Sequence, residues 1–450
     1  MEGFNHLIKI NAEISVNDFN MENLYRLLLV SFFCYFTFQL SGQTTYLHCG
    51  TILTMENTTS LTESTIIISG DSIVSIESGY LENDTIEIID LSEHTIMPGF
   101  MDMHVHIEHE SSPNRYMEKF SAESADVALN AVKYCERTLM AGFTTVRDLG
   151  GTGVNVSLRK AVDKDYITGP RIYTCEKSLA TTGGHADPTN GVKKTLRGDP
   201  GPSDGVINSA EDAYKAVRQR YKNGADVIKI TATGGVLSVA KDGQGPQFTV
   251  NEVEAVVKAA NDYGMVTAAH AHGAEGMKRA VLGGIHSIEH GTFMTEEVMK
   301  LMVEKGTWYV PTISAGEFVA EKAKQPGFYP AIIVPKAMAI GPRILETFTK
   351  AYNYGVPIAF GTDSGVSYHG DNAREFGYMV KGGMEPYEAL LTATVNASKL
   401  LRIENDYGTI EAGKKADLVA VIGNPLEEIT ILENVNFVMK GGKVYKNITN

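Results

Sequence analysis

The stretch Gly99-Phe100-Met101-Asp102-Met103-His104-Val105-His106 follows Pro98 and is largely apolar. Its length and composition predict a short strand, and alternate side chains of a strand face the same way. His104 and His106 therefore point to one side. Neutral imidazole nitrogens suit zinc, and a catalytic zinc keeps one coordination position open for water. Alone, this His-x-His step is a weak signal, because paired histidines in a strand are more often structural or surface residues.

From residue 99 onward, short strand-like runs alternate with helical patterns. This alternation predicts an α/β fold, a (β/α)8 TIM barrel, whose active sites lie at the C-terminal ends of the strands. A doubly wound open sheet is the alternative, but no Gly-x-Gly-x-x-Gly turn follows the first strand. The predicted strands are Gly99–Ile107, Thr144–Asp148, Arg171–Leu179, Val227–Thr231, Val266–Ala271, Ser287–His290, Trp308–Thr312 and Pro357–Gly361. The helical patterns include Ala122–Met140, Ser209–Asn223, Asn251–Tyr263, Glu296–Glu304 and Pro342–Tyr354.

Two β-rich pieces flank this alternation, residues 43–97 and 408–450, and the barrel is expected between them over residues 98–407. Each piece contains only a few short runs of strand-forming residues, separated by Gly, Asn and Asp turns. Neither has enough strand to make a stable sheet alone. We therefore expect one small β-sandwich that is formed by both chain ends.

Composition places the chain among soluble globular proteins, with 43% hydrophobic and 21% charged residues over 450 positions. The formal net charge is -14 without a basic cluster, which argues against a nucleic-acid partner. The four cysteines are sparse and contain no Cys-x-x-Cys, so neither a disulfide framework nor a thiolate metal site is expected. A homo-oligomer stays open.

The N-terminal region, residues 1–42, has the layout of a secretory signal peptide. Arg26 precedes the apolar run Leu27–Phe38, and the small residues Ser41 and Gly42 follow. The run is short for a membrane span, so we expect export to the periplasm or the medium, with no stable span after cleavage. Leu40 makes the cleavage site imperfect, and a buried helix or an uncleaved anchor is the alternative.

Four more candidate metal ligands end later predicted strands: Lys229, His270, His290 and Asp363. Lys229 lies in an otherwise apolar strand, where a buried, unpaired ammonium is costly. A neutral lysine amine can take up carbon dioxide, and the two oxygens of the resulting carbamate could bridge two metals. A salt-bridged lysine at a strand end is the alternative. Asp363 could ligate one metal and also move a proton from the attacking water to the leaving amine.

Together these motifs resemble those of the metal-dependent amidohydrolase superfamily, over nearly the whole chain after residue 42. The matching segments are Pro98–His106, Thr182–His185, Val227–Ile230, His270–Gly273, Ile288–Gly291, Gly361–Ser364 and Gly408–Val419. They are most similar to the imidazolonepropionase-related branch, which includes zinc Xaa-Pro dipeptidases, carboxypeptidases for C-terminal basic residues and ochratoxin-type amidases.

The resemblance implies a binuclear site with two divalent ions, zinc by default. It places His104, His106 and Asp363 on one ion, His270 and His290 on the other, and N6-carboxylysine at Lys229 with a hydroxide as bridges. True imidazolonepropionases and the mononuclear deaminases lack the lysine bridge.

Two further histidines are candidate substrate contacts. The resemblance places His185 near the scissile carbonyl, where an imidazole could stabilise the oxyanion. His272 shares a strand face with His270 and could reach a terminal carboxylate of the substrate. Members of the branch often have tyrosine at the position of His272, so this departure bears on specificity. For both residues, an ordinary surface histidine is the alternative.

These features predict a binuclear zinc hydrolase that cleaves the amide bond of a dipeptide or an N-acyl amino acid by a metal-bridging hydroxide. The alternative is a cyclic-amide hydrolase, imidazolonepropionase-like, or a deaminase that uses His272 and Glu275. The deaminase would leave Lys229 and His270 unexplained. A binding protein without activity should have lost metal ligands, and here all six are present.

Overall fold

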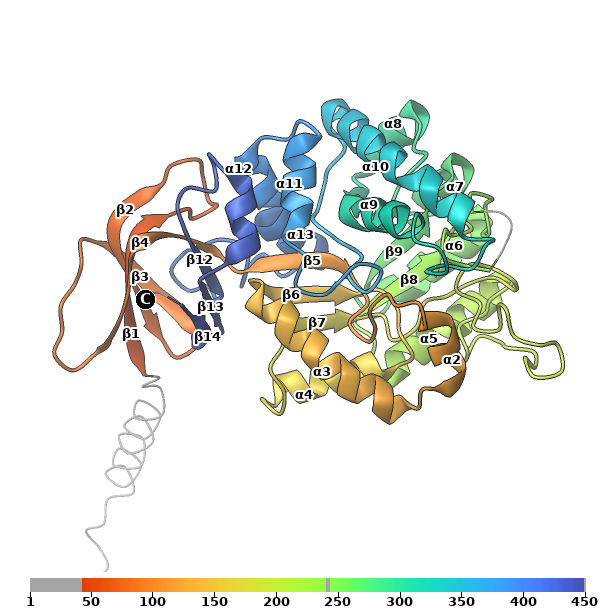
Figure 1. The fold of residues 1–450 in the computed structure, drawn as a ribbon, viewed down its shortest axis with the longest axis horizontal. Helices are drawn as coiled ribbons and strands as arrows, with labels where there is room; N and C mark the ends of the chain where they lie inside the picture. The colour runs from red at the N-terminus through yellow and green to blue at the C-terminus, as the bar shows by residue number, and fades with distance from the viewer. Residues whose placement is uncertain (1–42, 240–242, 449–450) are drawn as a thin grey trace, which may run out of the picture.

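The computed structural model describes residues 43–239 and 243–448. They form two adjacent parts, a sheet-rich domain and a larger α/β part (Figure 1). The expected signal peptide, residues 1–42, lies outside the described residues. Within the described ranges, no helix combines the length and the apolarity that a membrane crossing requires.

Both chain ends contribute to the sheet-rich domain, as the sequence predicts. Its strands are β1 (Thr44–Ile52), β2 (Leu61–Ser69), β3 (Ser72–Ser78), β4 (Glu87–Pro98), β12 (Leu418–Ile422), β13 (Phe437–Lys440) and β14 (Lys443–Asn447). They make one continuous sheet in the order β14-β13-β12-β4-β1-β2-β3. The ends join where β12 pairs antiparallel with β4, with Val419 opposite Met97. Residues of β1, β2, β4, β12 and β13 form a hydrophobic core of their own, which makes this part a separate domain.

The α/β part contains two parallel sheets. One has the order β5-β6-β7 and the other β11-β10-β9-β8. The strands are β5 (Phe100–Val105), β6 (Phe143–Asp148), β7 (Arg171–Thr174), β8 (Val227–Thr231), β9 (Val266–Ala271), β10 (Ser287–His290) and β11 (Trp308–Val310). Seven of the eight predicted barrel strands are therefore present, and three have the predicted bounds.

Irregular segments connect these two sheets into the barrel. Beyond β7 the chain turns at Glu176, which has φ +63°, and Leu179 then pairs with β8 through Ile230. On the other side Ile358 pairs with Tyr309 of β11, and the Met103 amide of β5 donates to Phe360 O at 2.9 Å. The predicted eighth strand thus occupies its place as an irregular segment and carries the chain to Asp363.

Helices surround the strands (Figure 1). They are α2 (Arg115–Ser121), α3 (Ser124–Met140), α4 (Val154–Asp163), α5 (Ala210–Asn223), α6 (Val250–Asn261), α7 (Ala274–Leu282), α8 (Glu296–Lys305), α9 (Ile313–Lys322), α10 (Val334–Tyr354), α11 (Arg374–Lys381), α12 (Pro386–Leu391) and α13 (Ala397–Leu401), with a π-helical turn η2 (Thr392–Asn396) and a 3-10 turn η3 (Ile429–Asn434).

One predicted helix start is wrong. Proline favours the first turn of a helix, so the pattern places a start at Pro342, yet α10 begins at Val334 and continues through Pro342. The additional turns pack closely on α9, because a Cβ at Gly341 would lie 2.8 Å from the Cβ of Ala320. This tertiary packing offsets the helical hydrogen bond that Pro342 cannot make.

Candidate metal centre

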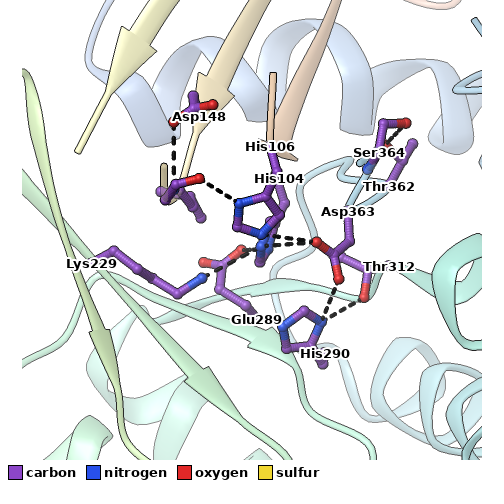
Figure 2. Close-up of polar contacts among 12 residues, drawn as sticks. His104, His106, Asp148, Lys229, Glu289, His290, Thr312, Thr362, Asp363 and Ser364 are labelled. Atoms are coloured by element: carbon purple, nitrogen blue, oxygen red, sulfur yellow. Dashed lines mark hydrogen bonds and ion pairs between the residues drawn. The ribbon is translucent and has the colours of Figure 1, made fainter. Parts of the chain in front are cut away.

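Three residues from two distant parts of the chain meet at the C-terminal end of β5. The Nε2 atoms of His104 and His106 lie 3.5 and 3.2 Å from Oδ1 of Asp363 (Figure 2). Ligand atoms from the three side chains all lie within 4.8 Å of one another, so they could hold one ion. The alternation along β5 continues to His106, the residue after the strand, and turns both imidazoles to the same side, as the sequence predicts.

The other three predicted ligands lie beside this group. Lys229 on β8 brings Nζ to 3.4 Å from His104 Nε2. The His290 ring, at the end of β10, lies 4.9 Å from the His104 ring, between centroids, and its Nδ1 is 4.0 Å from Asp363 Oδ2. The His270 ring on β9 lies 4.7 Å from that of His290. The structure therefore brings all six predicted ligands together.

Hydrogen bonds at the Nδ1 atoms fix the orientation of three of these imidazoles. Nδ1 of His104 lies 2.9 Å from a Glu289 carboxylate oxygen, and Nδ1 of His106 lies 2.7 Å from Gly150 O. Nδ1 of His290 lies 2.8 Å from the Thr312 hydroxyl. Each of these contacts leaves Nε2 for a metal, the arrangement that usually accompanies histidine ligands.

Glu289 and Arg147 belong to this cluster, although the sequence motifs did not single them out. Arg147 on β6 is fully buried, and its Nη2 donates to Glu289 at 2.9 Å while its Nε donates to Met103 O at 2.6 Å. Glu289 thus links this cation to His104. Each of the two is a charged residue within a short, buried strand, and this is the signal in the sequence that could have indicated them. They are 142 positions apart, so their pairing follows only from the fold.

Burial and neighbouring charges favour the protonation states that metal ligation requires at most of these ligands; at His106, burial acts to lower the pKa, but the hydrogen bond and charge of Asp363 raise it. Burial, with the Lys229 charge, lowers the pKa of His104 to about 4, and burial also lowers the pKa of His270 and of His290. Burial lowers the pKa of Lys229 as well, which raises the fraction of neutral amine. Burial acts to raise the pKa of Asp363, but the adjacent imidazoles outweigh it and the carboxyl stays ionised.

Strained backbone supports this arrangement. His290, Thr312 and Asp363 have φ values of +69°, +52° and +58°, a region that residues other than glycine rarely adopt. His290 and Asp363 are candidate ligands, and Thr312 hydrogen bonds to His290. Such strain persists only where the surrounding structure enforces it, and it concentrates at functional sites.

The donor set fits a metal. Oδ1 of Asp363 is buried and has no hydrogen-bond donor among the described residues, which is costly for a carboxylate oxygen unless a cation occupies the space beside it. Neutral imidazoles together with a carboxylate are ligands that zinc and similar divalent ions accept.

The two predicted substrate contacts lie next to these ligands. The His185 ring stacks on that of His270 at 4.3 Å, and a Cβ at Gly235 would lie 2.1 Å from it, so only glycine fits there. The His272 ring is 5.1 Å from that of His290, and its Nδ1 lies 2.8 Å from the Thr292 hydroxyl. Burial lowers the pKa of His185 to about 3 and that of His272 to about 4, so both imidazoles are neutral near pH 7.

The chain is similar to known proteins in sequence and in fold. The model of the Amidohydrolase family matches residues 95–446. The structure of a Xaa-Pro dipeptidase with bound methionine in the active site is 52% identical, with a TM-score of 0.88 over 90% of this chain and 100% of that one. A prolidase complexed with N-methylphosphonate-L-proline is 30% identical, with a TM-score of 0.83 over 90% of this chain and 100% of that one.

Among curated proteins, ochratoxinase from Aspergillus niger is 33% identical over 370 residues, which cover 78% of this chain and 75% of that protein. Family, fold and relatives agree on a (β/α)8 amidohydrolase fold with a separate sheet-rich domain. The chain belongs to the amidohydrolase family and is a hydrolase that acts on carbon–nitrogen bonds.

Proposed function

We propose that this protein is a binuclear zinc hydrolase that cleaves the amide bond of a dipeptide or an N-acyl amino acid. The observation that carries the proposal is the cluster of the six candidate ligands, which contains the buried, unpartnered Oδ1 of Asp363. His104, His106 and Asp363 would hold one ion, His270 and His290 the other, and Lys229, carboxylated on its neutral amine, would bridge both.

When bound, such ions polarise an amide carbonyl and lower the pKa of a water molecule. The remaining steps fall to side chains of this chain. Asp363 accepts the proton of the attacking water through a carboxylate oxygen and passes it to the nitrogen of the leaving amine. His185, stacked beside His270, donates a hydrogen bond toward the carbonyl oxygen as negative charge develops on it. Glu289 and Arg147 keep His104 in one orientation throughout.

The substrate class is supported by the names and ligands of the relatives. Two solved structures are a dipeptidase and a prolidase, with bound methionine and N-methylphosphonate-L-proline respectively. Both ligands contain an amino-acid moiety with a free carboxylate, which favours an amino acid as the leaving group here. The apolar run that precedes residue 42 supports export of the enzyme.

The test is a substrate panel on enzyme reconstituted with zinc, with dipeptides, N-acyl amino acids, cyclic amides and aminated heterocycles assayed side by side. We expect two metals per chain by elemental analysis and activity on the first two groups. Asp363→Asn should abolish turnover, whereas Asp371→Asn, at an acidic residue 45% exposed, should not. A clear preference for a cyclic amide or for deamination would contradict the proposal, and so would full activity with one metal per chain.

A further inference from the structure

Arg115 is a partly buried cation without an anionic partner. It is the first residue of α2, which follows the loop that leaves the C-terminal end of β5. Among the described residues, no carboxylate lies within ion-pair distance of its guanidinium, and no acceptor forms a hydrogen bond with it. A guanidinium that is withdrawn from water without such partners is costly, which makes it a candidate for binding an anion.

The nearby carboxylates are engaged elsewhere. Glu108 and Glu118 are close enough to raise the pKa of Arg115, yet burial has the larger effect and lowers it. The Glu108 carboxylate accepts hydrogen bonds from the Thr152 and Asn155 amides at 2.6 and 2.7 Å. The Glu118 carboxylate accepts one from the Ser112 hydroxyl at 3.3 Å. Neither carboxylate pairs with the guanidinium, so its N–H groups are available to another anion.

Two contacts place α2 at the rim of the metal centre. The segment between β5 and α2 contains His109, whose ring stacks on that of the candidate ligand His106 at 5.3 Å between centroids. The hydroxyl of Tyr116, the next residue of α2, donates to Leu237 O at 2.6 Å. Leu237 belongs to the loop after β8 that also contains Gly235, whose backbone lies against His185. α2, which begins at Arg115, therefore lies at the rim of the candidate site.

In the proposed function the leaving amine receives its proton from Asp363, which lies 3.2 Å from His106 and 3.5 Å from His104. An amino acid whose nitrogen faces Asp363 would extend its carboxylate away from the candidate metal ligands and toward this rim. A guanidinium suits a carboxylate, since two parallel N–H donors match its two oxygens.

We propose that Arg115 is a specificity-determining residue that binds the free carboxylate of the leaving amino acid. This inference rests on the proposed function, and it restricts the substrates to amides whose leaving group is an α-amino acid with an unblocked carboxyl group. Arg115 binds and orients the substrate and takes no part in proton transfer.

The experiment compares kcat/KM for one N-acyl amino acid, or one dipeptide, with that for its C-terminal amide. In the wild type the free acid should be preferred. Arg115→Gln should lower kcat/KM for the free acid by about 30- to 500-fold and for the amide by less than about threefold, because a charge-assisted contact is lost with only one substrate. The kcat/KM of Arg115→Lys for the free acid should lie between those of the wild type and Arg115→Gln, because lysine keeps the charge but lacks the planar pair of N–H donors. Arg343→Gln, at an arginine on α10 that is 51% exposed, is the matched control.

A second measurement is independent of turnover. The product amino acid should raise the melting temperature of the wild type more than its amide does, and this difference should vanish in Arg115→Gln. Equal losses for both substrates, or an unchanged preference for the free acid in the variant, would overturn the role of Arg115 and leave the proposed function standing. A wild type that cleaves neither substrate would refute the proposed function, and the inference with it.

Discussion

Glu289→Gln tests whether the contact between the Glu289 carboxylate and His104 Nδ1 determines the metal affinity of the site. The buried Glu289 carboxylate accepts hydrogen bonds from Arg147 Nη2 at 2.9 Å and from the Ser287 hydroxyl at 2.5 Å, and it lies 2.9 Å from His104 Nδ1. A glutamine has the same shape but only one acceptor oxygen and no charge. If that oxygen stays on Arg147, the amide NH2 group faces Nδ1 of His104. His104 must then accept at Nδ1 and hold its proton on Nε2, the nitrogen that faces Asp363.

Glu289→Gln should lower both the stability of the fold and the affinity for zinc, for different reasons. Arg147 and Glu289 are both fully buried, and removing one partner of such a pair costs about 3–5 kcal/mol because the other charge is left uncompensated. The proton on His104 Nε2 opposes ligation, and loss of the partner that orients a ligand usually lowers metal affinity about 10- to 100-fold. That factor corresponds to about 1.4–2.7 kcal/mol of binding free energy.

Guanidinium chloride unfolding of the metal-free protein measures the first loss, and zinc competition with a chromogenic chelator measures the second. Glu254→Gln is the matched control, because this residue is 43% exposed and its pair with Lys258 is worth less than about 1 kcal/mol. A Glu289→Gln protein with reduced stability and unchanged zinc affinity would refute the argument from the His104 tautomer. Wild-type behaviour in both assays would also refute the argument from the buried pair.

Three further outcomes are expected. Lys229→Ala should reduce the metal content from two ions to one or none and abolish most activity, with partial rescue by small carboxylates; full activity with unchanged metal content would contradict the bridging role. His272→Ala should lower kcat/KM for a free-acid substrate by about tenfold or less, because a neutral imidazole supplies one uncharged hydrogen bond; a loss of several hundredfold would mean that His272 carries the charge recognition assigned to Arg115. Protein isolated from its native host should begin near Gln43 by intact-mass measurement, and retention of Met1 or Met21 in a cytoplasmic protein would rule out export.

The sequence by itself determined the order of the elements and the identity of the candidate ligands. The strands Val227–Thr231, Val266–Ala271 and Ser287–His290 have the bounds that the sequence predicts. Buried parallel strands are short apolar runs between helices, so the sequence pattern that predicts each strand lies within that strand. Alternation along β5 also decided that His104 and His106 face one way, because side-chain direction in a strand depends only on neighbouring residues. The resemblance to the amidohydrolases then supplied the grouping of the ligands.

Only the tertiary structure decided the contacts between segments that lie far apart in the chain. The buried link from Arg147 through Glu289 to His104 joins three strands, and no local pattern records it. The course of α10 through Pro342 depends on its packing against α9, which overrides the local preference of proline. The exposure and the partners of Arg115 likewise depend on which carboxylates the fold engages elsewhere. Burial and charge pairing arise from the whole chain, and local sequence patterns do not determine them.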